Sequence, residues 1–350
     1  MNAHALGILE FPRLLAYVAG RASSAPGAAA VRALVPRTDR EWIETEHARV
    51  NAVRALLVSE LGWPTESIPD LGEALKRLRI AGLTWTALEL LQGATLLRSS
   101  RRMREMLRDP RRPAIVLAYL TSYAQALIDL RALEEAIARA ISDDGTVRDD
   151  ASPALRRVRR ELRQAEGELV RLLEREMGKL ETHHQVSDLS ITMRNGRWVI
   201  PMRREAKGYV GGIVHDSSGT GATIFVEPPA AVEFGNRVRE LEIEEQREVE
   251  RVLRDLTEAL HPYHEAISAA FAALVALDSL YARARYSLDA NCAPLAFGAP
   301  AEGVCIVDGR HPLLLAKGIP VVPFDLTLHA DERTLLVSGP NTGGKTVLLK

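Results

Sequence analysis

A glycine-rich motif close to the end of the chain constrains its fold more than any other feature. Residues 339–346 fit the phosphate-binding pattern G-x-x-x-x-G-K-[ST]. A short apolar run of strand type, residues 334–338, precedes the motif, and an apolar run follows it as the opening of a helix. This order predicts the start of an α/β P-loop domain over residues 301–350. The motif reads Gly339-Pro340-Asn341-Thr342-Gly343-Gly344-Lys345-Thr346.

The residue types in this motif suit a bound ATP. Backbone N–H groups of Gly343 and Gly344 can surround phosphate oxygens because glycine has no Cβ atom in the way. Lys345 is expected to reach the β- and γ-phosphates, and Thr346 is expected to hold Mg²⁺. The competing interpretation is a glycine-rich turn that Lys and Thr follow by chance. The strand before the motif and the apolar run after it argue against that interpretation.

The chain ends at Lys350, four residues after Thr346. A P-loop ATPase also needs a further strand with an acidic residue for the metal, and a group that positions water. We therefore expect the chain to hold the opening of an ATPase, truncated just after the P-loop (Walker A) motif. By itself the chain is expected to be inactive.

Composition limits the class of protein. A length of 350 residues with 47% hydrophobic content predicts about two or three packed domains. The net charge of −1 means that any nucleic-acid-binding surface must be local. Two cysteines without metal-ligand spacing suggest a reducing compartment. Neither a signal peptide nor a run of about 18 apolar residues is visible, so we expect a cytoplasmic protein with no membrane partner.

Two long helical arms are predicted after a helical core and lever domain, residues 1–145. In the first arm, residues 146–187, apolar residues alternate at spacings of three and four, which is the seam of a coiled coil. A similar stripe runs through the second arm, residues 229–300, where Pro262 is expected to introduce a kink. Because neither arm can bury its stripe alone, we expect them to pack antiparallel. The first seam consists of Leu155, Val158, Leu162, Ala165, Leu169 and Leu172.

Between the arms, residues 188–228 predict a small β-unit at the arm tip. Asn195-Gly196 is a strong hairpin signal between two short strands, and further strands are expected over residues 209–214 and 223–226. The fold class is therefore mainly α, with this β-unit and the first strands of a P-loop ATPase domain.

A cluster of cations makes the β-unit a candidate for contact with a nucleic-acid backbone. Residues 194–207 hold five basic residues and one acid, a local charge of +4. An ordinary solvated hairpin is the alternative, since runs of charge are usually just exposed faces. The candidate residues are Arg194, Arg197, Arg203, Arg204 and Lys207.

Several motifs together resemble the MutS superfamily of DNA-processing ATPases, in its second branch, the MutS type-two proteins. The Pro-Asn pair and the double glycine inside the P-loop are more specific than the generic pattern. The resemblance covers essentially all 350 residues. The other matching motifs are Leu9-Glu10-Phe11-Pro12-Arg13, Val214-His215-Asp216-Ser217-Ser218-Gly219, Phe225-Val226-Glu227-Pro228, Gly309-Arg310-His311-Pro312-Leu313 and Val321-Val322-Pro323-Phe324-Asp325.

This resemblance implies a homodimeric ATPase that uses ATP and Mg²⁺, binds branched DNA and suppresses homologous recombination. In some members it also implies binding to collided ribosomes, with contact to rRNA, and splitting of those ribosomes. Many members end in an endonuclease domain, none of which is in this chain. By position, Asn341 would approach the γ-phosphate, and Val321 and Val322 would flank the adenine.

Two other functions stay open on the sequence. A coiled-coil chromosome-structure or break-repair ATPase would place its P-loop before the arms, whereas here the P-loop follows them. A non-enzymatic helical scaffold would show no nucleotide-dependent behaviour. Within the MutS type-two interpretation, both DNA and the ribosome remain candidate partners.

Overall fold

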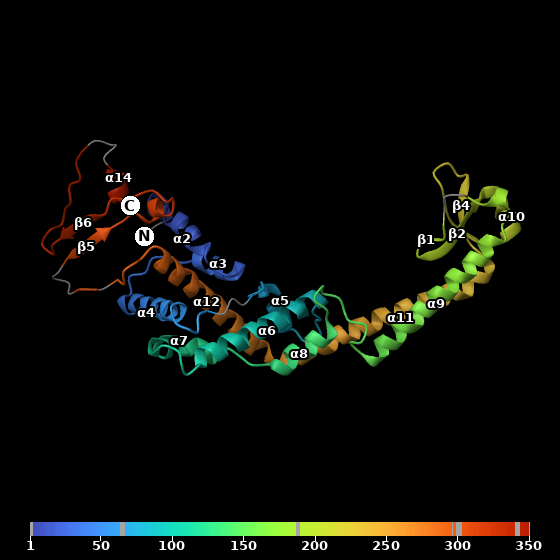
Figure 1. Cartoon of the computed structure of the whole chain (residues 1–350), viewed down its shortest axis with the longest axis horizontal. Coiled ribbons are helices and arrows are strands. Elements are labelled where there is room, and N and C mark those ends of the chain that lie inside the picture. Colours follow the sequence, from blue (N-terminus) through green and yellow to red (C-terminus); the bar gives the residue numbers. More distant parts are fainter. Residues whose placement is uncertain are drawn as a thin grey trace. The chain divides into compact units, whose positions relative to one another are not determined.

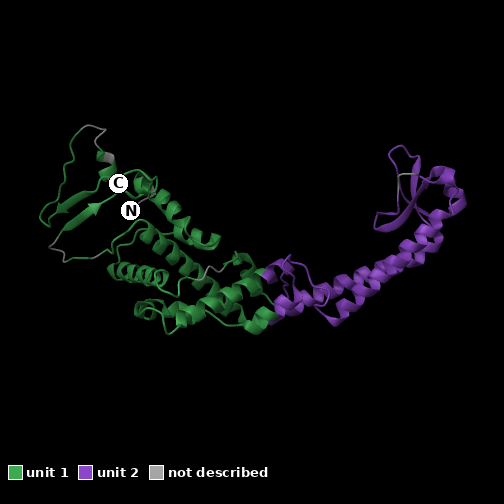
Figure 2. Ribbon diagram, viewed as in Figure 1, with its two compact units in different colours: residues 1–81, 92–135, 260–350 green, residues 82–91, 136–259 purple. Residues whose placement is uncertain are grey.

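The chain is mainly helical with small sheets, as the sequence predicts (Figure 1). The computed structural model describes residues 3–63, 67–186, 190–295, 297–298, 303–339 and 344–349. These residues form two compact units (Figure 2). Unit 1 consists of residues 1–81, 92–135 and 260–350, and unit 2 consists of residues 82–91 and 136–259.

Unit 1 is built around one central helix, α12 (His264–Asp289). Helices α2, α3, α4 and α7 pack against it. The buried carboxylate of Asp278 on α12 accepts hydrogen bonds from the backbone N–H and hydroxyl groups of Ser23 and Ser24, at 2.6–3.0 Å. Ser24 also caps α3 by accepting the N–H of Gly27. The other helices in this part of the sequence are α1 (Ala3–Ile8), α2 (Phe11–Ala19), α3 (Ala25–Arg32), α4 (Arg40–Leu57), α5 (Gly72–Leu78), α6 (Ala87–Arg108), α7 (Ala114–Ala126) and α8 (Arg131–Ala140).

Unit 2 contains two long helices, α9 (Pro153–Gly178) and α11 (Pro229–Leu260). Ser152 caps α9 by accepting the N–H of Leu155 at 3.0 Å, and Pro153 occupies the first turn, where a missing N–H costs nothing. Ion pairs join the helices at Arg157–Glu244, Arg159–Glu245 and Arg237–Glu161. Glu161, the last of these α9 residues, pairs with Arg237, which comes before Glu244 and Glu245 on α11, so the helices run antiparallel. Their packing as a coiled coil stays a prediction.

The expected second arm is interrupted at Pro262. The α-helical ladder stops at Leu260, a 3₁₀ turn η3 (His261–Tyr263) follows, and α12 begins at His264. Proline has no N–H to donate and its ring crowds the preceding turn, so regular helix cannot continue through it. As a result α11 contributes to unit 2 and α12 to unit 1.

The same helical stretch corrects one expectation about composition. An 18-residue window within residues 229–289 reaches a mean hydropathy of 1.4, so one stretch is long and apolar enough to cross a membrane by length and composition. Half of that window is buried inside the molecule. The core helix of a soluble protein passes the same test, so the stretch is weak support for a membrane span.

The β-unit is an antiparallel four-stranded sheet in the order β1-β2-β4-β3. Asn195 and Gly196 have φ angles of 52° and 74°, which fit the predicted hairpin turn. The expected strand over residues 209–214 is wrong in its first half, where the short helix α10 (Lys207–Val210) forms instead. Gly211 and Gly212 have φ angles of 68° and 92°, outside the strand region. The strands are β1 (Thr192–Arg194), β2 (Arg197–Arg203), β3 (Ile213–Ser217) and β4 (Thr223–Glu227).

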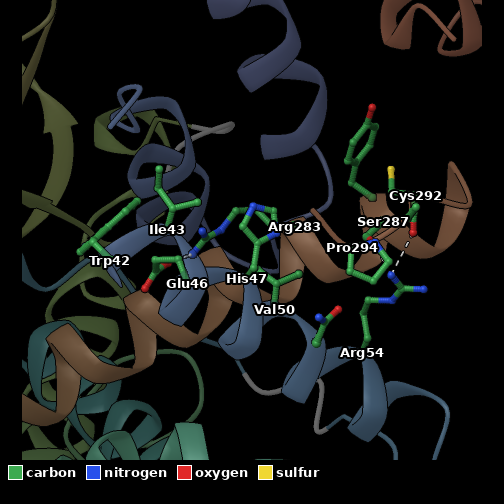
Figure 3. A pocket seen from close by; sticks show the side chains of 13 residues that line it. Trp42, Ile43, Glu46, His47, Val50, Arg54, Arg283, Ser287, Cys292 and Pro294 are labelled. Carbon is green, nitrogen blue, oxygen red and sulfur yellow. Dashed lines mark hydrogen bonds and ion pairs between the residues drawn. The ribbon is translucent and has the colours of Figure 1, made fainter. Parts of the chain in front are cut away.

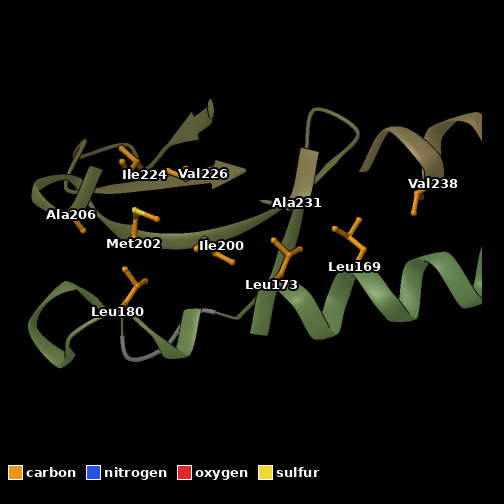
Figure 4. Close-up of a cluster of buried hydrophobic side chains, with 10 residues drawn as sticks. All are labelled: Leu169, Leu173, Leu180, Ile200, Met202, Ala206, Ile224, Val226, Ala231 and Val238. Atoms are coloured by element: carbon orange, nitrogen blue, oxygen red, sulfur yellow. The ribbon is translucent and has the colours of Figure 1, made fainter. Parts of the chain in front are cut away.

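One hydrophobic cluster fixes this sheet to the helices of unit 2 (Figure 4). Ile200 and Met202 of β2 and Ile224 and Val226 of β4 point into it from the sheet. The helices supply side chains from the second half of α9 and the beginning of α11. Burying this apolar surface stabilises the position of the β-unit on the helices. The helical and turn residues are Leu169, Leu173, Leu180, Ala206, Ala231 and Val238.

The C-terminal part contains less regular structure than the sequence predicts. The antiparallel pair β5 (Val304–Gly309) and β6 (Phe324–Leu328), the short helix α13 (Pro312–Leu315) and helix α14 (Lys345–Leu349) are present. The expected strand over residues 334–338 is wrong, because this segment pairs with no strand in the described residues and Leu336 is 87% exposed. A strand forms only where a neighbour satisfies its backbone N–H and C=O groups.

Candidate nucleotide and nucleic-acid sites

The P-loop leads directly into helix α14, as its motif predicts. The helix begins at Lys345, and the carbonyl of Gly344 accepts the N–H groups of Val347 and Leu348 at 2.9 and 3.0 Å. Gly339 and Gly344 have φ angles of 138° and 77°, which glycine adopts with little strain. Pro340, Asn341, Thr342, Gly343 and the side chain of Thr346 lie outside the described residues.

Lys345 contacts the other described end of the motif. Its Nζ donates a hydrogen bond to the carbonyl oxygen of Gly339, on the other side of the motif. An ammonium group held there, beside the free N–H groups of a helix start, fits a phosphate ligand. The described residues of the motif are therefore compatible with a nucleotide.

The two valines expected at the adenine lie just before β6. Val321 is half-buried, whereas Val322 is 86% exposed. An exposed aliphatic side chain can pack on a planar base only through apolar contact.

The five candidate cations of the β-unit fall into two groups. Arg194 forms an ion pair with Asp216 at 3.3 Å, and its guanidinium lies 4.6 Å from the ring centroid of Phe225. Arg197 contacts Glu227 at 3.3 Å and donates to the Oδ1 of Asn236 at 2.9 Å. Because carboxylates of the β-unit already pair with both charges, the contacts of these two arginines stabilise the fold.

The second group, Arg203, Arg204 and Lys207, is exposed on one continuous segment. Arg204 donates from Nε to the carbonyl of Gly221 at 2.6 Å, which orients its guanidinium. Within the part of the chain that the structure describes, Arg203 and Lys207 have no ion pair. Glu205 is the one acid between them. The exposed segment 203–207 is thus the part of the predicted basic cluster that is open to a phosphate backbone.

A buried carboxylate, Glu227 at the end of β4, holds Arg197 of the first group in place. Its side chain is only 3% exposed, and it contacts both Arg197 and the Nε2 of His215, the latter at 2.7 Å. Sequence reasoning placed Glu227 only inside a family motif and did not predict its role. A lone Glu that ends the apolar run Ile224-Phe225-Val226 was the available signal, because a buried charge requires a partner.

Unit 1 contains a separate pocket of about 320 Å³ between α4, α12 and residues 292–294 (Figure 3). Within it, Glu46 pairs with Arg283 at 2.9 Å, and with Arg49 at 2.7 Å. Burial acts to raise the pKa of the Glu46 carboxyl, but the two arginines outweigh it, so this pKa lies below its usual value. Arg54 is bonded to Ser287 and to the carbonyl of Cys292. Both arginines that line this pocket, Arg54 and Arg283, therefore already have partners, which makes it a weak candidate for an anion site.

Comparisons with known proteins give one consistent result. No protein-family model matches the chain. Over all 350 residues it is 81% identical to the endonuclease MutS2 of Gemmatimonas aurantiaca. It is 37% identical to the endonuclease MutS2 of Geobacillus thermodenitrificans and 34% identical to that of Acetivibrio thermocellus, again over its whole length. The chain spans 43–44% of the length of these relatives.

Proposed function

We propose that the chain forms part of an ATP-dependent nucleic-acid-binding protein. Its similarity to MutS2 proteins over its whole length supports this and confirms the resemblance to the second branch of the MutS superfamily. The intact protein would hydrolyse ATP as a homodimer in the cytoplasm. It would bind branched or recombination-intermediate DNA and suppress homologous recombination. The relatives are named endonucleases, and we place no nuclease site on these 350 residues.

The observation that carries this proposal is the exposed segment 203–207 on the β-unit. In a chain of net charge −1, three cations and one acid, Glu205, are gathered on one small surface, and no cation there has an ion pair within the described residues. Arg and Lys side chains contact phosphate oxygens regardless of base sequence, so this surface would bind a nucleic-acid backbone rather than read bases.

The P-loop supplies the nucleotide half of the proposal. Lys345 would contact the phosphates of ATP, Thr346 would ligate Mg²⁺, and Val321 and Val322 would pack against the adenine. ATP would supply the phosphoryl group whose hydrolysis changes the state of the protein. A chromosome-structure ATPase with its P-loop before the arms is disfavoured, because this chain has the opposite order.

The nucleic-acid half is tested by replacing Arg203 and Arg204 with Ala in the intact protein. Binding to four-way junction DNA and to ribosomes is measured across a salt series. Each lost phosphate contact should lower the slope of log affinity against log salt by about 0.9 on duplex DNA. The partner that loses affinity identifies the polymer, since DNA and rRNA offer the same phosphate chemistry.

A matched control removes the same charge elsewhere in unit 2. Arg171 and Arg175 are exposed on α9, and their double replacement by Ala should leave both salt slopes unchanged. If the Arg203/Arg204 variant matches wild type for both partners, the segment is an ordinary solvated surface and the proposal fails.

The nucleotide half is tested by Lys345→Ala in the intact protein. Removing the phosphate-facing ammonium should abolish ATP hydrolysis, while nucleic-acid binding without nucleotide persists. Lys317→Ala removes an exposed lysine from unit 1 and should retain wild-type turnover. Undiminished hydrolysis by Lys345→Ala would contradict the role of the P-loop.

A further inference from the structure

The turn that follows α9 brings two imidazoles and a carboxylate together. Glu181 precedes the 3₁₀ turn η1 (Thr182–His184), and His183 and His184 lie within it. One ligand atom from each of Glu181, His183 and His184 lies within 4.8 Å of the other two. Within the described residues this is the one group of three such side chains at metal-ligand spacing.

The spacing of one donor pair is close to that of a tetrahedral metal site. The Nδ1 of His183 lies 3.4 Å from the Oε2 of Glu181. Donors bonded to zinc at 2.0–2.1 Å in a tetrahedron are about 3.4 Å apart. Glu181 and His183 are largely exposed, so small side-chain rotations can bring the remaining donor atoms to that distance.

The backbone of this turn is already fixed. The N–H of His184 donates to the carbonyl of Glu181 at 2.8 Å, and the side chain of Gln185 donates to the carbonyl of Leu180 at 2.7 Å. His184 is buried, and its ring lies 3.9 Å from that of His183 and 4.9 Å from that of Tyr209. A ligand would therefore bind to donors whose main chain is largely ordered beforehand, which lowers the entropy cost of binding.

We propose that Glu181, His183 and His184 bind a divalent transition metal of the zinc class. Two imidazole nitrogens with one carboxylate oxygen suit Zn²⁺, Co²⁺ or Ni²⁺, whereas Mg²⁺ and Ca²⁺ prefer oxygen ligands alone. Three protein ligands leave at least one coordination position for water or another donor. This site lies on unit 2, apart in sequence from the P-loop, and does not depend on the proposed function.

The second histidine pair of the chain is a weaker candidate. His261 and His264 have ring centroids 5.6 Å apart. The Nδ1 of His261 is bonded to the carbonyl of Leu78, and that of His264 to the carbonyl of His261. Each ring has one nitrogen already engaged. Glu265 lies 3.9 Å from the Nε2 of His264, but among the described residues no carboxylate completes a group of three with both rings.

The test titrates the untagged 350-residue chain with Co²⁺ and, separately, with Zn²⁺. Calorimetry should give one site per chain, and the visible absorption bands of bound Co²⁺ should report its coordination. His183→Ala, at an exposed position, should weaken binding about tenfold or more, and Glu181→Gln should weaken it as well. Circular dichroism checks that both variants remain folded.

Two further variants decide which histidines bind. His329→Ala removes an exposed histidine outside the group and should bind like wild type. Wild-type affinity in His183→Ala, or loss of the site in His261→Ala alone, overturns the proposal. Absence of a stoichiometric site in the wild-type chain leaves only an ion pair between Glu181 and His183, and also overturns it.

Discussion

At the scale of single residues, the buried carboxylate Glu227 decides how the β-unit is held. It is bonded to Arg197 and His215, so removing it leaves the half-buried guanidinium of Arg197 without its carboxylate. We expect Glu227→Ala to destabilise the β-unit by about 3 kcal/mol. Urea unfolding followed by the fluorescence of Trp198, with the other tryptophans replaced, measures this change. Glu205→Ala, at an exposed position of the same unit, should have little effect.

A second residue-scale prediction concerns acid stability. Burial acts to raise the pKa of Glu134, but hydrogen bonds from Arg101 and Arg98 outweigh it and lower this pKa below its usual 4.5. A carboxyl whose pKa is lower in the folded than in the unfolded state stabilises the fold at pH values above its unfolded-state pKa. This stabilisation is lost as the pH falls through the folded-state pKa. The free energy of unfolding should therefore decline below about pH 4.5.

Glu134→Gln removes this titration. Its free energy of unfolding should be lower than that of the wild type at pH 7, and the two should converge in acid. A difference that stays constant between pH 7 and pH 3 would show that the ion pairs of Glu134 do not contribute to acid unfolding.

At the scale of elements, the link between α9 and α11 is uneven along its length. Arg159 is 18% exposed and bonds to Glu245, Asp149 and the carbonyl of Val147, each at 2.7–2.8 Å. Arg157 is 58% exposed and reaches Glu244 at 3.5 Å. In an exposed ion pair, screening by water and the loss of side-chain entropy cancel most of the attraction between the two charges. A largely buried arginine with several hydrogen bonds keeps more of that attraction.

We expect Arg159→Ala to lower the free energy of unfolding by about 1–3 kcal/mol. Arg157→Ala should change it by less than about 0.5 kcal/mol. A double-mutant cycle of Arg159→Ala with Glu245→Ala isolates the pair itself. Equal effects at both arginines would mean that the contacts across the helices do not differ in strength.

At the scale of the whole molecule, the apolar segments around the P-loop remain uncovered. Val304, Val307 and Leu336 are exposed, and residues 334–338 pair with no described strand. Apolar strands of a P-loop sheet are normally buried on both faces. In the part of the chain that the structure describes, the P-loop thus has no sheet packed around it.

The purified 350-residue chain should therefore show no ATP turnover. The loop can contact phosphate, but within the described residues no strand pairs with residues 334–338 to hold an acidic metal ligand beside it. A coupled assay of phosphate release, with Lys345→Ala as the background, measures the rate. Turnover that depends on Lys345 would show that the missing groups come from elsewhere in these residues.

Local sequence was sufficient for the features that depend on near neighbours. The helical character of residues 1–145, the hairpin at Asn195-Gly196 and the helix start after Gly344 follow from spacing, turn chemistry and capping. The motifs also identified the family, which comparison of the whole chain confirmed. Each of these features is set by residues a few positions apart, so the sequence carries them directly.

The tertiary structure decided the features that need a distant partner. Arg194 and Arg197 belong to the fold because Asp216 and Glu227 lie beside them, which no local pattern reports. Residues 334–338 have strand composition yet form no strand, since a strand exists only with a neighbour to pair with. Charge pairing and sheet formation both join residues that are far apart in the sequence. Only the tertiary structure therefore shows which of these residues meet.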